Sequence, residues 1–123
     1  MITCIVIDDD ANTTEVFSDI LELIGLQVVG KGYDGNDALS LYKKHLPDVV
    51  FTDVVMPYAD GFYALEKIRE FDPNAKVIAV TADFTMDVER RLKEMNVTAI
   101  IRKPFDQNEI KQVLIHKYKI NTP

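Results

Sequence analysis

Short apolar runs alternate with longer amphipathic stretches along the whole chain. The runs are rich in Ile and Val and contain few polar residues, which is typical of strands buried on both faces. The longer stretches carry apolar residues at helical spacing. The pattern predicts strands over Ile2–Ile7, Gln27–Gly30, Val49–Asp53, Val77–Val80 and Ala99–Arg102, and helices over Thr13–Ile24, Asp37–Leu46, a segment that begins at Gly61, Met86–Met95 and Gln107–Lys117.

Turn-forming residues separate these elements. Gly25 lies where a helix C-terminal cap is expected, and Asp34-Gly35 and Asp72-Pro73-Asn74 are turn sequences. Strand and helix alternate five times. This alternation predicts an α/β fold in which helices cover both faces of a parallel sheet and the strands are joined by right-handed crossovers.

The composition is that of one globular domain. The chain has 123 residues, 47% of them apolar and 28% charged, with no repeat or long linker. A net charge of −6 argues against a nucleic-acid partner, which needs a basic patch. No membrane span of about 20 apolar residues and no signal peptide is recognisable, so we expect a cytoplasmic protein. The single cysteine, Cys4, falls in a predicted strand and is interpreted as a core residue.

Polar residues follow four of the predicted strands. Asp8 and Asp9 end the first, Asp53 ends the third, Thr81 ends the fourth and Lys103 follows the fifth. Ligands of open parallel sheets bind beyond the carboxyl ends of the strands. We therefore expect these five side chains to form one site.

The three carboxylates indicate a divalent cation. Two carboxylates about 4 Å apart repel by about 4 kcal/mol at an effective dielectric constant near 20. Oxygen ligands suit Mg²⁺, with Mn²⁺ as the alternative, whereas zinc prefers His and Cys. A simpler explanation for Asp8, Asp9 and Asp10 is that they cap the first helix and complement its dipole.

Lys103 and Thr81 add an ammonium and a hydroxyl to this acidic site. The ammonium can pair with Asp53 and neutralise an incoming anion. Together with a metal these groups suit a phosphoryl group, and a carboxylate can attack phosphorus to give an aspartyl phosphate. On its own, a threonine at a strand end or a surface lysine would carry little weight.

These residues lie in sequence motifs that resemble the receiver domain of two-component response regulators, and the resemblance covers essentially the entire chain. The resemblance implies a single doubly wound, flavodoxin-like (βα)5 domain with strand order 2-1-3-4-5. The motifs are Ile5-Val6-Ile7-Asp8-Asp9, Phe51-Thr52-Asp53-Val54-Val55-Met56-Pro57 with Asp60-Gly61, Val80-Thr81-Ala82 and Lys103-Pro104-Phe105.

The resemblance also implies a role for each site residue. Asp53 would accept a phosphoryl group from a phosphohistidine of a histidine kinase or histidine phosphotransfer protein. Asp9, Asp53 and the backbone carbonyl of Val55 would ligate Mg²⁺, while Asp8 would act mainly through water. Thr81 and Lys103 would bind phosphoryl oxygens.

The resemblance further implies that the bond before Pro104 is cis, an arrangement that only proline makes at low cost.

The chain departs from the family pattern at positions that bear on mechanism. Val55 stands where relatives often have a polar residue, so it cannot orient an attacking water, and we expect slow self-dephosphorylation. Ile100 replaces the Tyr or Phe of many receivers, so an aromatic switch at that position is doubtful. Asn96-Val97-Thr98 replaces the usual Gly-Ala pair ahead of the last strand, so the downstream partner cannot be assigned by analogy.

We expect the chain to be a single receiver domain over residues 1–123. It ends at Pro123, soon after the last predicted helix, which leaves no room for an output domain. The expected function is therefore a stand-alone signalling module, and not a conventional enzyme, that acts through phosphorylation-dependent contacts with an unknown protein.

Three other functions remain open at this point. A phosphohydrolase of the haloacid-dehalogenase type would use Asp8 as its nucleophile, but Asn12 stands where that family has Thr or Val. A flavodoxin-like cofactor binder would need a Ser/Thr/Gly-rich loop where this chain has Asp8-Asp9-Asp10. A receiver-like protein could also bind partners without being phosphorylated.

Overall fold

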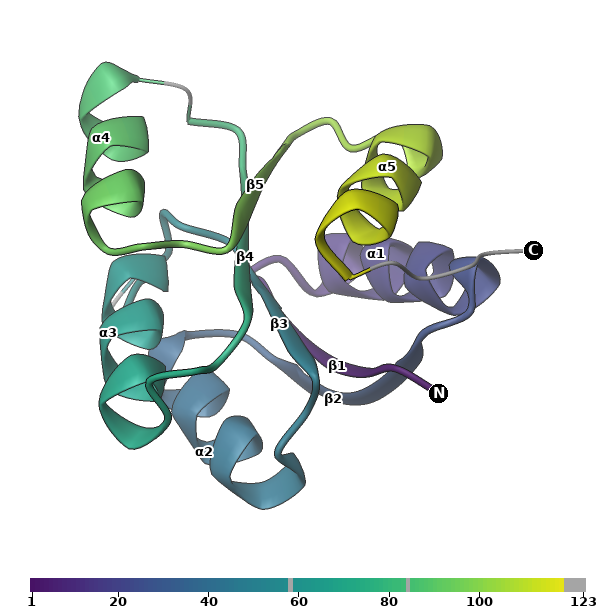
Figure 1. Ribbon diagram of the computed structural model, residues 1–123, viewed down its shortest axis with the longest axis horizontal. Coiled ribbons are helices and arrows are strands. Elements are labelled where there is room, and N and C mark those ends of the chain that lie inside the picture. Colours follow the sequence, from purple (N-terminus) through teal and green to yellow (C-terminus); the bar gives the residue numbers. More distant parts are fainter. Residues whose placement is uncertain (58, 84, 119–123) are drawn as a thin grey trace.

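Strands and helices alternate through the structure, a computed structural model that describes residues 1–57, 59–83 and 85–118 (Figure 1). The strands are β1 (Thr3–Ile7), β2 (Gln27–Gly32), β3 (Val49–Thr52), β4 (Val77–Thr81) and β5 (Ala99–Arg102), and the helices are α1 (Ala11–Ile24), α2 (Gly35–His45), α3 (Gly61–Phe71), α4 (Met86–Glu94) and α5 (Gln107–Tyr118).

All the strand pairs are parallel, and the order is β2-β1-β3-β4-β5. The predicted doubly wound α/β fold and its strand order are therefore confirmed. The register brings Ile7 of β1 opposite Thr52 of β3, and Thr81 of β4 opposite Arg102 of β5. The residues that follow these positions consequently leave the sheet at the same edge.

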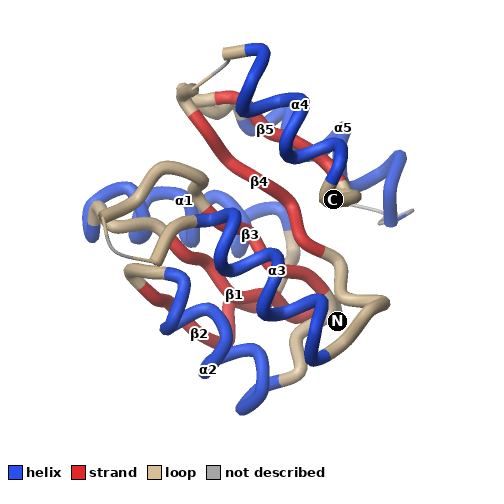
Figure 2. Tube along the Cα trace, turned by 90° about the vertical axis from the view of Figure 1, so that its left-hand side faces the viewer, coloured by secondary structure: helices blue, strands red, loops and turns tan. Residues whose placement is uncertain are grey.

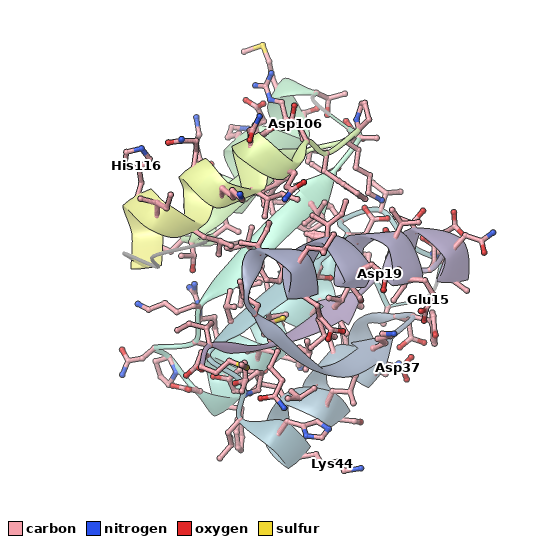
Figure 3. The ribbon with its side chains drawn as sticks, turned by 90° about the vertical axis from the view of Figure 1, so that its right-hand side faces the viewer. Glu15, Asp19, Asp37, Lys44, Asp106 and His116 are labelled. Atoms are coloured by element: carbon pink, nitrogen blue, oxygen red, sulfur yellow. The ribbon has the colours of Figure 1, made fainter. Side chains whose placement is uncertain are left out.

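Helices cover both faces of the sheet. The helices α2, α3 and α4 lie on one face (Figure 2), and α1 and α5 lie on the other (Figure 3). Each face has its own apolar cluster, one containing Leu65 and Ile68 of α3 and the other containing Phe17 and Leu21 of α1. The strands are buried on both sides, which explains why they are apolar without alternation.

The strand β1 illustrates this division between the two faces. Ile5 and Ile7 pack into the α2–α3 side, while Cys4 and Val6 pack into the α1–α5 side, because successive residues of a strand point to opposite faces. Cys4 is fully buried, and burial, with a smaller effect from Glu22, raises the pKa of its thiol to about 12. It is the core residue that the sequence predicts.

Aspartates set the starts of the helices earlier than the sequence pattern indicates. Asp10 accepts a hydrogen bond from the backbone of Asn12, so α1 begins at Ala11 and not at Thr13. Asp34 caps α2 in the same way, so this helix includes Gly35. The apolar periodicity misses such first turns because capping residues are polar.

The loop after β3 is fixed by a close approach of two backbones. Gly61, the first residue of α3, donates a hydrogen bond from its N–H to the carbonyl oxygen of Val54 at 2.8 Å. A Cβ atom at this position would lie 2.7 Å from Val54 Cα and closer still to the carbonyl oxygen of Asp53. Only glycine lets α3 start here.

We predict that Gly61→Ala destabilises the fold by about 1–3 kcal/mol, because the added methyl group meets backbone that cannot move aside. Gly30→Ala is the control, since its methyl group would meet the end of the Leu41 side chain at 3.0 Å and should cost less. Urea unfolding of both variants measures the difference. Equal losses would show that the backbone contact at Gly61 has no special cost.

Candidate functional site

Three carboxylates converge at the carboxyl edge of the two central strands. One oxygen from each of Asp8, Asp9 and Asp53 lies within 4.8 Å of the others. Asp8 follows β1 and Asp53 follows β3, and the Asp53 N–H donates to the Ile7 carbonyl oxygen at 2.8 Å, which extends the ladder to the site. Asp8 is 5% exposed and Asp53 9%, whereas Asp9 lies at the surface.

Lys103 places its ammonium between two of these carboxylates. Its Nζ lies 2.7 Å from Asp8 Oδ2 and 3.3 Å from Asp53 Oδ2. The Lys103 N–H donates to the Thr81 carbonyl oxygen at 2.9 Å, and the bond from Lys103 to Pro104 is cis. The site therefore joins β1, β3 and β5, the last through a residue 95 positions along the chain from Asp8.

Burial and neighbouring charges shift the pKa values of Asp53 and Lys103. Burial raises the pKa of Asp53, and the Lys103 ammonium offsets only part of this rise because Asp8 adds a like charge. Burial lowers the pKa of Lys103, but the hydrogen bond to Asp8 and the charges of Asp53 and Asp8 together bring it above its ordinary value.

These shifts have opposite consequences at neutral pH. Because its pKa is raised, Asp53 holds its proton more tightly in the folded protein than in the unfolded chain. Its protonated form therefore favours folding, and this contribution to stability is lost as pH rises through the raised pKa. At neutral pH the ionised carboxylate therefore costs stability. Lys103 stabilises the fold throughout the neutral range and stops doing so only when pH rises through its own raised pKa.

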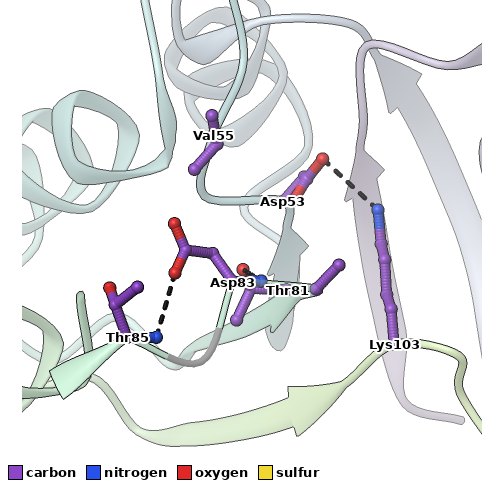
Figure 4. Close-up of a pocket in the computed structure, with 7 residues that line it drawn as sticks. Asp53, Val55, Thr81, Asp83, Thr85 and Lys103 are labelled. Carbon is purple, nitrogen blue, oxygen red and sulfur yellow. Dashed lines mark hydrogen bonds and ion pairs between the residues drawn. The ribbon is translucent and has the colours of Figure 1, made fainter.

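An open pocket of about 690 Å³ lies beside Asp53 and Lys103 (Figure 4). Thr81 lines it at the end of β4, and its hydroxyl oxygen accepts a hydrogen bond from the Asp83 N–H at 3.0 Å. The pocket thus brings together the hydroxyl, the ammonium and the Asp53 carboxylate. The full set of residues that line it is Asp53, Val55, Thr81, Ala82, Asp83, Thr85 and Lys103.

The sequence analysis missed Asp83 and Thr85. Asp83 comes two residues after the end of β4, and its carboxylate accepts a hydrogen bond from the Thr85 N–H at 3.0 Å. The rule that selected Asp53, a polar residue beyond the carboxyl end of a strand, would also have selected Asp83 if it had been extended along the loop.

Val55 and Ile100 occupy different surroundings. The Val55 side chain lines the pocket and is 61% exposed. Ile100 lies outside the pocket, half-buried against the core cluster on the α2–α3 side, as are Val88 of α4 and Met95, the residue that caps α4. Its aliphatic side chain is thus a packing residue in this structure.

The donor set fits a small divalent cation. Adjacent oxygens around Mg²⁺ are about 3 Å apart and opposite ones about 4 Å, so small rotamer changes would bring the three carboxylates into range. Both oxygens of Asp8 already accept hydrogen bonds, from Lys103 Nζ and from the Asp10 N–H. Asp9 and Asp53 are therefore better suited than Asp8 to ligate the ion directly.

Comparisons with known proteins agree on one family. The model of the response regulator receiver domain matches residues 4–115. The chain is 37% identical to Protein CcdB of Bacillus subtilis over 109 residues, which are 88% of this chain and 91% of that protein. It is 30% identical to the chemotaxis protein CheY of Thermotoga maritima over 110 residues, covering 89% of this chain and 92% of that one.

A solved structure gives the same result. The crystal structure of a CheX-CheY-BeF3-Mg²⁺ complex from Borrelia burgdorferi superposes with a TM-score of 0.88 at 28% identity, covering 94% of this chain and 87% of that chain. This chain belongs to the response regulator receiver domain family. It is a CheY-like signalling domain of two-component systems, and its acidic cluster fits Mg²⁺ binding. Within the described residues, no helix is long and apolar enough to cross a membrane.

We predict that Lys103→Met, in EDTA at neutral pH, lowers the free energy of unfolding by about 2 kcal/mol, because Asp8 and Asp53 then face each other without a cation. Added Mg²⁺ should restore part of the loss. Lys31→Met is the control, since it removes an exposed ion pair with Glu15 and should cost less than about 1 kcal/mol. Urea unfolding with and without Mg²⁺ tests this. Equal losses in the two variants would contradict it.

Proposed function

We propose that Asp53 accepts a phosphoryl group from a phosphohistidine of a histidine kinase or phosphotransfer protein, and that the phosphorylated domain signals through contacts with another protein. The observation that carries the proposal is the position of Asp53, which lies beside the other two carboxylates, within reach of the Lys103 ammonium, and in the lining of a pocket that Thr81 also lines.

The surroundings of Asp53 suit a nucleophile that needs both orientation and charge compensation. Its Oδ1 accepts a hydrogen bond from the Val54 N–H at 2.8 Å, which fixes the plane of the carboxylate. In the transfer, an Asp53 oxygen forms a bond to phosphorus while the bond from phosphorus to the histidine nitrogen breaks, and the imidazole keeps the electron pair. Lys103 and Thr81 are suited to bind the phosphoryl oxygens.

Mg²⁺, when bound, would neutralise charge on the transferring oxygens. Asp9 and Asp53 would hold it directly, together with the backbone carbonyl of Val55 that the family resemblance implies. Asp8 would contribute through water and would keep Lys103 in place. The expected role of Mn²⁺ as a substitute rests on the same all-oxygen donor set.

The output would begin at the loop between β4 and α4. Thr81 is tied to this loop by the hydrogen bond from the Asp83 N–H, and Thr85 caps α4 by accepting from the Val88 N–H. A Thr81 hydroxyl drawn to a phosphoryl group would change both contacts. Only Leu92 of α4 is fully buried, so this helix has little packing that resists a shift.

A protein partner for the output is supported by the solved relative, a CheY in complex with CheX. We also propose that the domain acts on its own. This is supported by the length of two relatives, because the matched residues make up 91% of one and 92% of the other. The cytoplasmic location stays a prediction from the sequence.

A hydrolase with Asp8 as its nucleophile is the second candidate, and the surroundings of Asp8 disfavour it. The hydrogen bonds from Lys103 and from the Asp10 N–H lower the nucleophilicity of its two oxygens, whereas Asp53 faces the open pocket. Substituting Asp8 and Asp53 one at a time therefore distinguishes the two functions by experiment.

We predict that incubation with Mg²⁺ and phosphoramidate adds one phosphoryl group to the protein and that Asp53→Asn abolishes the addition. Intact-protein mass spectrometry measures it, with EDTA as the metal-free control. Asp8→Asn should slow the addition without abolishing it. An adduct that survives Asp53→Asn but not Asp8→Asn would establish the hydrolase instead.

We predict that the phosphoryl group is lost slowly, because the apolar Val55 side chain lies in the pocket and cannot hydrogen-bond an attacking water. Val55→Asn should speed the loss several-fold. The decay of the adduct mass after donor removal measures both rates. Rapid loss from the unsubstituted protein would reject the idea that Val55 limits hydrolysis.

A further inference from the structure

An exposed apolar surface lies at the amino edge of the sheet, at the opposite end from the pocket. Leu46, the residue that caps α2, is 64% exposed, and Phe71 at the end of α3 is 49% exposed. The Phe71 ring packs edge-on against Tyr42, and Lys43 Nζ lies 5.4 Å from the centre of the Phe71 ring. The ring is therefore held in place while part of it stays accessible to another molecule.

Leu46 has a backbone conformation that leucine rarely adopts. Its φ of 46° and ψ of 57° are left-handed, the conformation that helix ends usually assign to glycine. The Cβ atom makes this conformation unfavourable, and the exposed side chain gains little from packing within its own chain. Since neither the helix end nor the core favours leucine at this position, we interpret its side chain as a contact for another molecule.

Lysines surround these two apolar side chains. Lys43 and Lys44 are exposed in the last turn of α2, and Lys76 is exposed ahead of β4. Among the described residues, the ion pairs include none of the three. The nearby Asp72 carboxylate already accepts a hydrogen bond from the Tyr42 hydroxyl at 2.7 Å. This surface is basic on a chain of net charge −6, and we call it the basic end, which comprises Lys43, Lys44, Leu46, Phe71 and Lys76.

The outer side of α1 has the opposite charge. Val16 and Leu23 are exposed there, and so are Asp19 and Glu22, which form no ion pair within the part of the chain that the structure describes. The helix contains no Lys or Arg, and Glu22 lies in its last turn, where the helix dipole disfavours a negative charge. A shallow hollow of about 450 Å³ is lined by Asp19, Glu22 and Leu23. We call this surface the acidic face, and it comprises Val16, Asp19, Glu22 and Leu23.

The two surfaces are complementary but lie on different sides of the molecule. The helix α1 covers one face of the sheet, whereas α2 and α3 cover the other (Figure 2), and Figure 3 shows Lys44 at the end of α2 and Asp19 on α1. Each surface combines two exposed apolar side chains with charges of one sign. Because the packed sheet separates them, one copy cannot bring its own two surfaces together. We propose that the basic end of one copy docks on the acidic face of a second copy.

The apolar side chains form the centre of this contact and the charges surround it. Leu46 and Phe71 pack into the hollow beside Leu23 of the other copy, and the lysines face Asp19 and Glu22. An apolar centre within a polar rim is the usual composition of a protein interface, and the charges select a surface of opposite sign. The association is weak, because both surfaces are small and exposed ion pairs contribute little.

The contact joins two different surfaces, so it does not close on itself as a two-fold dimer does. Each bound copy still offers a free basic end or a free acidic face, and further copies add head to tail. The residues of the two surfaces are absent from the lining of the pocket beside Asp53. The contact itself therefore leaves the pocket uncovered.

Sedimentation velocity on the unsubstituted protein tests the inference at concentrations from about 10 µM to about 1 mM, where weak interfaces form. We expect the weight-average mass to rise with concentration and to pass the mass of a dimer. Raising sodium chloride from about 50 mM to about 500 mM should reduce the rise, because salt screens exposed charges. A mass that stays at that of the monomer, or that levels off at that of the dimer, would overturn the inference.

Charge reversal on each surface gives a sharper test. Lys43→Glu with Lys44→Glu makes the basic end acidic, and Asp19→Lys with Glu22→Lys makes the acidic face basic. Each double variant alone should associate at least about tenfold more weakly, because its two surfaces then carry charge of the same sign. An equimolar mixture of the two should associate like the unsubstituted protein, because every surface again meets one of opposite sign. A mixture that stayed monomeric would show that charge pairing is not the cause, and the inference would fail.

Leu46→Gly separates association from folding. Glycine adopts the left-handed conformation without strain, so urea unfolding should show no loss of stability, while the association should weaken about three- to tenfold as the apolar contact is lost. Arg90→Glu with Lys93→Glu is the matched control, since it reverses two exposed charges of α4 outside both surfaces and should leave the association unchanged. Association that survived Leu46→Gly and both charge reversals would place the contact elsewhere and overturn the inference.

Discussion

Repulsion among the carboxylates of Asp8, Asp9 and Asp53 is the constraint around which this domain is organised. The two buried members follow adjacent central strands, and the parallel register gives them no way to separate. Burial makes the repulsion stronger, since charges interact more strongly away from water. The fold tolerates the arrangement because the Lys103 ammonium lies 2.7 Å from Asp8 and 3.3 Å from Asp53.

The same constraint makes the site responsive. A site whose charge is incompletely balanced attracts a cation, and a bound cation would in turn favour the approach of an anionic phosphoryl group, as the proposed function requires. Lys103 would link ligand binding to the sheet, because a ligand that draws its ammonium away from Asp8 would also pull on the end of β5, which Lys103 follows. Under the proposed function, stability and reactivity would therefore depend on one set of contacts.

The loop after β4 connects the pocket to α4, the helix where the proposed output begins. The hydrogen bonds of Thr81, Asp83 and Thr85 link the pocket to the first turn of α4, a helix with one buried residue, Leu92. The same bonds hold the Asp83 carboxylate in the lining of the pocket. Transmission of the signal would thus pass through one short segment whose polar side chains are bonded to backbone groups.

The sequence by itself determined the α/β class, the alternation of strands and helices, and the placement of Asp8, Asp9, Asp53, Thr81 and Lys103 at strand ends, because burial on both faces and helical periodicity are local patterns. The motifs added the family and its strand order. Only the tertiary structure decided that Lys103 pairs most closely with Asp8, that Ile100 packs against the core cluster under α2, α3 and α4, and that Asp83 lines the pocket. These contacts join residues from different strands and loops, so they depend on sheet register and loop geometry, which no local pattern encodes.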